Sequence, residues 1–251
     1  MKFSVIIPAR YASVRFPGKP LVDVAGKPMV VRVAERARRS GASEILIATD
    51  HELIAAAAVR HGFEAVMTSA KHASGTDRLA EVVMRRRYPA HHIIVNVQGD
   101  EPLIDPVLIR QVAAGLARRR GVHMSTACHR IRDPRELANA NVVKVVLDDE
   151  GYALYFSRAP IPYARDAFAR GIVRIPPRLP AYRHLGIYAY RAGFLRRFTR
   201  LAPAAIERFE ALEQLRALAH GYRIAVAVTR RAPHPGVDTR ADLLRVRRLA
   251  K

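Results

Sequence analysis

The sequence predicts an α/β protein with a mostly parallel central sheet, helices on both faces of that sheet, and a smaller strand-rich inserted lobe. Short runs of Val and Ile alternate with longer amphipathic stretches through the first half of the chain. Such alternation is typical of parallel strands connected by helices. Each of the first strands ends in a polar cluster, and ligands of open α/β sheets bind at the carboxyl ends of the strands. Beyond residue 120 the sequence pattern changes to strand-like segments with little helix between them.

The first half contains regularly alternating elements. Uninterrupted apolar runs predict strands at Phe3–Ile7, Glu44–Ala48, Glu64–Met67 and His92–Val97. Amphipathic stretches predict helices at Pro28–Arg39, His51–His61, Asp77–Arg87 and Asp105–Arg120. The polar clusters that follow three of these strands are Pro8 to Arg10, Thr49–Asp50 and Gln98 to Pro102.

The second half predicts the inserted lobe and a return to the main sheet. Strands are expected at Met124–His129, Val142–Leu147, Ala153–Ser157, His184–Tyr190 and Tyr222–Val228. Helices are expected at Ala204–His220 and from Thr239 onward, and the Pro-rich basic stretch Pro160–Pro180 is expected to be a long loop. No internal repeat or low-complexity linker divides the chain. We therefore expect one domain over residues 1–251, with the lobe at about 130–200.

The charge of the chain raises the question of a polyanionic partner. The formal net charge is +21, but only six of the 43 basic residues are lysines, and many arginines lie beside alanines in helix-like stretches. This pattern is typical of solvated helix faces in an arginine-rich composition. Because no zinc finger, recognition helix or aromatic RNA-binding motif accompanies the charge, we expect no nucleic-acid partner.

The chain carries no pattern expected of a secreted or membrane protein. A single cysteine, Cys128, excludes an internal disulfide and is compatible with a reducing compartment. The apolar stretch before Pro8 is too short for a signal peptide, and the longest apolar runs are of strand length. These observations predict a cytoplasmic protein without a membrane segment.

The loop after the first strand carries three cations. The stretch IPARYASVRFPGKPL places Arg10, Arg15 and Lys19 among prolines and a glycine. Loops that follow a first strand are a usual place to bind phosphates. The pattern lacks the earlier glycine of a Walker loop, and Pro20 follows the Gly-Lys pair. Side chains rather than a glycine cradle are therefore expected to bind the phosphates.

Two aspartates are candidate magnesium ligands at strand ends. Asp100 lies in NVQGDEP just beyond a buried strand, and Asp238 lies in HPGVDT ahead of the last helix. Magnesium prefers one or two carboxylates together with phosphate oxygens and water. Each aspartate alone is as compatible with a turn or helix cap. Their occurrence together, opposite a basic loop, favours a metal-phosphate site.

Further polar residues lie at the ends of other elements. SGTDR opens a helix, with Thr76 expected as the N-cap, and can offer backbone N–H groups to a ligand. Alternation along a strand places His184 and Tyr188 on one face. A strand end also supplies Arg158. The Glu213-Gln214 pair projects away from the apolar positions of its helix, and solvation is the default interpretation of such a pair.

Eight motifs together resemble one known family. They are IPARYASVRFPGKPL, SGTDRL, NVQGDEP, VVKVV, YALYFSRAPIPY, HLGIYAYR, LEQLR and GVDT. In this order they resemble the 3-deoxy-manno-octulosonate (Kdo) cytidylyltransferases, over nearly the whole chain. The first loop alone indicates only the wider group of nucleotidylyltransferases. The resemblance implies a Rossmann-like nucleotidyltransferase fold and the reaction of CTP with Kdo to give CMP-Kdo and pyrophosphate.

The resemblance also implies roles for individual residues. Catalytic roles fall on Arg10, Lys19, Asp100 and Asp238, with magnesium held by Asp100 and Asp238. Nucleotide binding falls on Ala9, Arg10, Arg15, Lys19, Ser74, Gly75 and Arg78. Kdo binding falls on Gln98, Arg158, His184, Tyr188, Glu213 and Gln214. A homodimer formed through the inserted lobe and a product that enters lipopolysaccharide synthesis are further implications.

Two other functions remain open from the residues alone. A sister nucleotidylyltransferase would use another sugar acid, sugar phosphate or base, and a basic nucleic-acid-binding protein belongs to a different class. Pyrophosphate release that requires both Kdo and magnesium would distinguish the first alternative. Salt-sensitive retention on DNA without turnover would favour the second.

Overall fold

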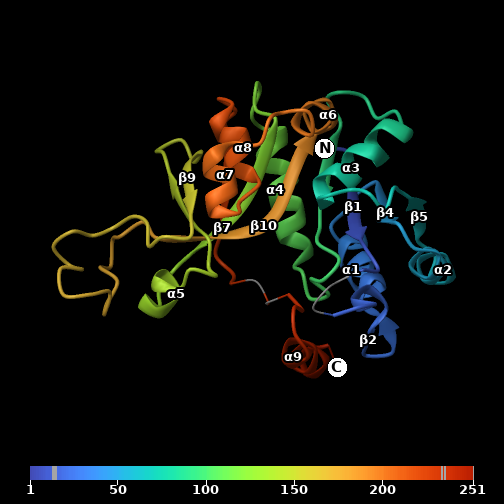
Figure 1. Cartoon of the computed structure of the whole chain (residues 1–251), viewed down its shortest axis with the longest axis horizontal. Coiled ribbons are helices and arrows are strands. Elements are labelled where there is room, and N and C mark those ends of the chain that lie inside the picture. The colour runs from blue at the N-terminus through green and yellow to red at the C-terminus, as the bar shows by residue number, and fades with distance from the viewer. Residues whose placement is uncertain (13–15, 233, 235, 251) are drawn as a thin grey trace.

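A computed structural model describes residues 1–12, 16–232, 234 and 236–250 (Figure 1). Its main sheet has the strand order β11-β7-β10-β6-β1-β4-β5. The strands are β1 (Phe3–Ala9), β4 (Glu44–Thr49), β5 (Glu64–Met67), β6 (Ile93–Asn96), β7 (Met124–Arg130), β10 (Tyr182–Arg191) and β11 (Ile224–Thr229). All neighbours along this order pair in parallel except β10, which is antiparallel to both β6 and β7. The predicted mostly parallel sheet is confirmed.

Helices cover both faces of the sheet (Figure 1). One face packs against α1 (Met29–Arg38), α2 (Glu52–Arg60) and α4 (Pro106–Ala117). The other packs against α3 (Gly75–Arg85), α6 (Ala192–Phe198) and α8 (Gln214–Ala219). We refer to these as the α4 face and the α3 face. Because both faces are covered, strand residues of either parity are apolar, which explains the continuous Val/Ile runs.

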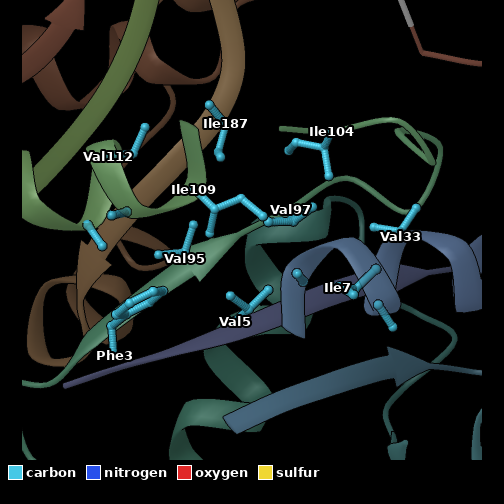
Figure 2. Packing of buried hydrophobic residues seen from close by; sticks show 14 of the residues in the cluster. Phe3, Val5, Ile7, Val33, Val95, Val97, Ile104, Ile109, Val112 and Ile187 are labelled. Carbon is cyan, nitrogen blue, oxygen red and sulfur yellow. The ribbon is translucent and has the colours of Figure 1, made fainter. Parts of the chain in front are cut away.

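The core on the α4 face shows how the strands and helices interlock. Figure 2 shows Phe3, Val5 and Ile7 of β1 beside Val95 of β6, with α1 and α4 packed above them. Ile6, between two of these residues, belongs instead to the core on the α3 face. Because side chains alternate between the two faces of a strand, β1 contributes residues to two separate cores.

All three strands predicted within the region 130–200 are present. Two of them, β8 (Lys144–Leu147) and β9 (Ala153–Ser157), form a hairpin that branches off the main sheet, where β8 pairs with Tyr182 and Arg183 at the start of β10. β10 itself lies within the main sheet, and residues 158–181 form neither helix nor strand. A separate small core holds this loop against α5 (Pro134–Ala138) through Leu137 and Phe168.

A buried lysine fixes the base of this hairpin. Lys144 is fully buried, and its Nζ donates to the carbonyl oxygens of Asn139 (2.9 Å), Val142 (2.6 Å) and Arg158. An ammonium group has three donors, and all three find acceptors here. The loop before β8 is therefore tied to the end of β9.

Several elements differ from the sequence-based expectation. The helix expected at Ala204–His220 is two helices, α7 (Ala205–Glu210) and α8, because the chain adopts a left-handed conformation at Ala211 (φ 51°). Its apolar pattern continues through this break, so periodicity alone misses it. Other short elements were also not predicted: α5, α6, the 3-10 helix η1 (Lys19–Leu21), β2 (Asp23–Val24) and β3 (Lys27–Pro28).

The last predicted helix is present as α9 (Arg240–Leu249), capped by Thr239. Cys128 is buried in β7, where desolvation raises the pKa of its thiol to about 12. Within the described ranges, no helix has both the length and the apolar composition that crossing a bilayer requires.

Candidate active site

A cavity of about 300 Å³ lies at the carboxyl ends of β1 and β6. It brings together residues from the first loop, the start of α3, the turn after β6 and the segment before α9. Nine residues that the sequence analysis assigned to the site line it: Ala9, Arg10, Lys19, Ser74, Gly75, Arg78, Gln98, Asp100 and Asp238. We call it the nucleotide cavity. Arg15 lies outside the described residues.

Two glycines allow the backbone to form this cavity. A Cβ atom at Gly99 would lie 2.9 Å from the carbonyl oxygen of Pro8, so only glycine fits between β1 and the turn after β6. Gly18 has φ 68°, the left-handed conformation, and its N–H donates to the carbonyl of Tyr11 (3.2 Å). This bond closes the first loop and places Lys19 at the start of η1.

Lys19 connects the two predicted metal ligands. Its ammonium donates to Asp100 Oδ2 (2.7 Å), to the carbonyl of Val237 (2.8 Å) and to Asp238 Oδ1 (3.4 Å). Both carboxylates therefore converge on one cationic position. Oxygen ligands of this kind match the preference of magnesium, which shares its coordination with phosphate oxygens. The described residues contain no group of three or more His, Cys, Asp or Glu side chains placed to hold a metal.

Arg78 is held rigidly at the edge of the cavity. It is 3% exposed, its Nη2 donates to Asp50 Oδ2 (2.8 Å), and its Nη1 donates to Thr68. Asp50 also accepts a hydrogen bond from the backbone N–H of Tyr11 (3.3 Å). This aspartate, directly after β4, thus contacts both Arg78 and the backbone of the first loop. The sequence analysis noted its polar cluster but gave it no role.

The start of α3 corrects one prediction. Ser74, not Thr76, is the N-cap: its hydroxyl accepts from the backbone N–H of Asp77, whose carboxylate accepts from Ser74 N–H. This reciprocal capping box leaves the hydroxyl of Thr76 available elsewhere. It donates to Glu213 Oε2 (2.5 Å). The capping position was missed because Ser and Thr, two residues apart, satisfy the same pattern.

Five of the six predicted substrate-binding residues do not line the nucleotide cavity, and four of these five lie together on one face of the sheet. His184, Tyr188, Glu213 and Gln214 lie on the α3 face of the sheet, and we call them the inner cluster. The rings of His184 and Tyr188 are 5.4 Å apart, so the predicted shared face is confirmed. It is retained despite an irregularity in the pairing of β10 with β7 between Leu185 and Tyr188.

Burial changes the protonation chemistry of the inner cluster. Desolvation lowers the pKa of His184 to about 3, which keeps the imidazole neutral. Its Nε2 lies 2.9 Å from the hydroxyl of Thr126, a residue without a predicted role. Desolvation also raises the pKa of Glu213, and the hydroxyl of Thr76 opposes this rise by donating to the carboxylate. The pKa of Tyr188 is raised by burial and by the nearby charge of Glu213.

Arg158 is engaged by backbone groups. Its Nε donates to the carbonyl of Glu210 (2.7 Å) and its Nη1 to the carbonyl of Ala140 (3.1 Å). Its own carbonyl accepts from Lys144. Arg158 therefore does not line the nucleotide cavity, and its assignment as a carboxylate partner of the substrate stays a prediction.

Two further residues near the site were not predicted. His72 lines the nucleotide cavity and pairs with Glu81 (2.5 Å). The position of His72 in the loop just before SGTDR was the feature of the sequence that could have indicated a place in the site. Glu101 lines a second cavity of about 100 Å³ together with His184. Desolvation and the neighbouring charge of Asp100 raise the pKa of Glu101 to about 7.

The chain is similar to cytidylyltransferases of known structure. A CMP:2-keto-3-deoxy-manno-octonic acid synthetase solved in complex with CTP is 41% identical, with a TM-score of 0.90 over 99% of this chain and 98% of that chain. A cytidylyltransferase from Leptospira borgpetersenii serovar Hardjo-bovis and a nucleotidyl transferase from Methanothermobacter are each 16% identical, with TM-scores of 0.60. They cover 96% and 99% of this chain and 82% and 97% of their own, and at this identity they share the fold alone.

The family assignment rests on sequence as well as on structure. The cytidylyltransferase family model matches residues 4–224, which include the first loop, the turn after β6 and the inner cluster. The match to the CMP-Kdo synthetase covers 99% of the chain. The predicted nucleotidyltransferase fold and the predicted resemblance are confirmed, and the chain belongs to the cytidylyltransferase family.

Proposed function

We propose that this protein activates Kdo with CTP, forming CMP-Kdo and pyrophosphate for lipopolysaccharide synthesis. The observation that carries the proposal is the 41% identity, over 99% of the chain, to a CMP-Kdo synthetase solved with CTP. The anomeric oxygen of Kdo attacks the α-phosphorus, the bond to the β-phosphate oxygen breaks, and pyrophosphate leaves. The anomeric hydroxyl gives up its proton to water in this step, so that the products are CMP-Kdo, pyrophosphate and one proton.

The nucleotide cavity supplies the groups that CTP requires. Arg10 and Lys19 carry positive charge toward the triphosphate, and Arg15 is proposed to add a third cation. Ser74, Gly75 and Arg78 line the cavity where α3 begins, and we assign the cytosine to this end. Because Asp50 already fixes Arg78, its guanidinium needs no reorganisation when the base binds.

Asp100 and Asp238 would hold magnesium, as their convergence on the ammonium of Lys19 supports. The ion, when bound, would neutralise phosphate charge and lower the pKa of the attacking hydroxyl. Lys19 would then be displaced from at least one carboxylate and become free to donate to phosphate oxygens. Its charge would matter most as negative charge builds on the leaving pyrophosphate.

The inner cluster, with Gln98 and Arg158, is proposed to bind Kdo. Gln98 lines the nucleotide cavity. Thr76 follows the cavity residues Ser74 and Gly75 directly and donates to Glu213, so the inner cluster and the cavity share one helix start. This adjacency supports a sugar acid placed beside the nucleotide. Arg158 would reach the substrate carboxylate after giving up a backbone acceptor.

The reaction is tested by measuring pyrophosphate release from CTP. Turnover should require Kdo and magnesium together, and omission of either should abolish it. Sialic acid should be used less well than Kdo by about 10⁴-fold, because a polar pocket rejects a substrate that leaves its groups unpaired. Comparable turnover of sialic acid would instead assign the protein to a sister activity.

We also propose a homodimer formed through residues 130–200, a cytoplasmic location and no nucleic-acid partner. The hairpin β8–β9 and the loop 158–181 project to one side of the molecule, which suits a contact surface (Figure 1). A protein that consumes CTP works where CTP is made. Sedimentation of the purified chain, fractionation of cells and a DNA-retention assay at low salt test the three statements. A monomer at micromolar concentration would contradict the first.

A further inference from the structure

Two buried polar atoms on the α3 face have no hydrogen-bond partner among the described residues. They are Asn96 Oδ1 and Gln214 Nε2, and their residues are 3% and 4% exposed. Buried side-chain amides are normally paired, and an unpaired one is costly to fold. Gln214 belongs to the inner cluster. Asn96 has been given no role so far.

The sheet places Asn96 on the same face as the inner cluster. Asn96 ends β6 and lies directly opposite Tyr188 of β10 in an antiparallel pair. Residues directly opposite in such a pair have side chains on the same face. On its other side Asn96 pairs with Ile6, which belongs to the core on the α3 face. Both neighbours therefore assign Asn96 to the face that carries His184 and Tyr188.

Asn96 also continues the line of residues that leads out of the nucleotide cavity. Asp100 and Gln98 line that cavity, and Val97 packs on the α4 face. Asn96 lies two residues before Gln98 and so points to the side opposite Val97. The order Asp100, Gln98, Asn96, Tyr188 runs from the proposed metal position to the inner cluster.

We infer that Asn96 is a further specificity-determining residue of this enzyme and that, with Gln214, it recognises hydroxyl groups of the acidic sugar. This inference rests on the proposed function. A neutral amide offers a donor and an acceptor, which matches a hydroxyl, whereas a carboxylate calls for a cation. Binding of the sugar provides hydrogen-bond partners for Asn96 Oδ1 and Gln214 Nε2, which have none in the structure without substrate.

The test is a comparison of Asn96→Leu with the wild-type enzyme. Leucine keeps the branched shape and removes the polar atoms. The Michaelis constant for Kdo should rise about 10- to 100-fold, as expected for a lost buried hydrogen bond to substrate. The Michaelis constant for CTP should stay within twofold. Gln111→Leu, which alters an exposed amide on α4, is the matched control and should change neither constant.

Thermal unfolding without substrates separates this role from a structural one. Because the unpaired amide oxygen of Asn96 makes no stabilising contact without substrate, its removal should leave the melting temperature unchanged or raise it by about 2–4 °C. A purely structural asparagine would instead give a lower melting temperature and similar changes in both Michaelis constants, and that result overturns the inference. Asn96→Ala is measured in parallel, in case leucine does not fit the site.

Deoxy analogues of the sugar identify the partner hydroxyl. The analogue that lacks the hydroxyl bound by Asn96 should lose affinity with the wild type but lose nothing further with Asn96→Ala. Independent losses for every analogue would overturn the inference. The proposed function fails separately: a wild-type enzyme without turnover of CTP and Kdo contradicts the function, whereas wild-type turnover with an unchanged Kdo constant in Asn96→Leu contradicts only the role of Asn96.

Discussion

The nucleotide cavity and the inner cluster differ in how their polar groups are satisfied. In the cavity, Lys19 and Arg78 are paired with carboxylates, and the space is open to a ligand of substantial size. In the inner cluster, His184 is neutral, Glu213 has a raised pKa, and Gln214 has an unpaired amide nitrogen. The first region is built before its ligand arrives. We propose that the second is completed only when a sugar acid supplies hydrogen bonds.

We propose that the two regions have different roles. The nucleotide cavity provides affinity for the nucleotide, and the inner cluster provides selectivity between sugars. Charged groups in an open cavity attract any nucleoside triphosphate strongly. Internal ion pairs already hold these groups in position before the nucleotide binds. Desolvated neutral groups add little attraction but strongly reject a sugar that leaves them unpaired. We therefore expect changes in the cavity to reduce turnover, and changes in the cluster to affect selection of the sugar acid.

The largest effect is expected at Asp100. Asp100→Asn removes one of the two carboxylates that converge on the Lys19 ammonium, and turnover should fall by about 10³-fold, a loss typical of removing a group that stabilises transition-state charge. Pyrophosphate release at saturating substrates measures it, and circular dichroism checks the fold. Asp166→Asn, at a side chain that is 94% exposed, is the control. Turnover near the wild-type value at ordinary magnesium would remove the metal assignment.

A smaller loss is expected at Lys19. Lys19→Met should lower turnover by about 10²-fold while the Michaelis constant for Kdo stays within threefold, because the charge acts on the leaving pyrophosphate. Without the competing ammonium, the Asp100–Asp238 pair should bind Mn²⁺ more tightly in the absence of nucleotide, as measured by electron paramagnetic resonance. Lys27→Met, in a surface ion pair with Glu35, is the control. Loss of Kdo binding with intact CTP affinity would contradict the assignment.

The inner cluster should make the protein acid-sensitive through His184. Its pKa is about 3 in the folded protein and about 6.5 in the unfolded chain, so between these values the unfolded state binds one more proton. The stability from this difference is fully present above pH 6.5 and is lost at about 1.4 kcal/mol per unit as pH falls below it. In urea unfolding, His184→Gln should lose less stability than the wild type between pH 6.5 and pH 4.5. The exposed His91→Gln should not differ from wild type, and equal slopes in all three proteins would show that His184 titrates normally.

The smallest effect is expected where the two regions meet. Thr76→Val keeps the side-chain shape but removes the hydroxyl that donates to Glu213. The Michaelis constant for Kdo should rise about 3- to 10-fold, the value of one hydrogen bond of about 1 kcal/mol. That for CTP should change by less than twofold. Thr199→Val, at the end of α6, serves as the comparison. Equal changes in both constants would mean that Thr76 supports the nucleotide cavity as well.

Periodicity predicted most of the fold but failed at local backbone features. Strand β5 was predicted over Glu64–Met67, as observed, because its flanking turns are marked in the sequence. The break between α7 and α8 was not predicted. Ala211 adopts a left-handed backbone conformation there, and the sequence has no glycine at this position to indicate it. Ala211 itself is exposed, whereas the preceding residue, Glu210, accepts hydrogen bonds from the Ser157 hydroxyl (2.5 Å) and the backbone N–H of Arg158 (2.9 Å), contacts between distant segments that periodicity does not register.

The site was predicted unevenly for a related reason. Residues at strand ends, such as Asp100, were found because parallel strands bring their carboxyl ends together. Asn96 was not predicted, because its position at the end of a buried apolar run gives no sign that its amide oxygen lacks a partner. Asp50 and Thr126 act through other residues, and such contacts between distant segments leave no spacing to detect.

The lone thiol gives this protein a practical property. Cys128 is buried, and burial keeps its pKa near 12, so maleimide reagents should leave the native protein unlabelled. A cysteine introduced at Val173, which is 79% exposed in the loop 158–181, would then be the sole target for a fluorophore. No background mutations would be needed, and movement of that loop during turnover could be followed from one defined position.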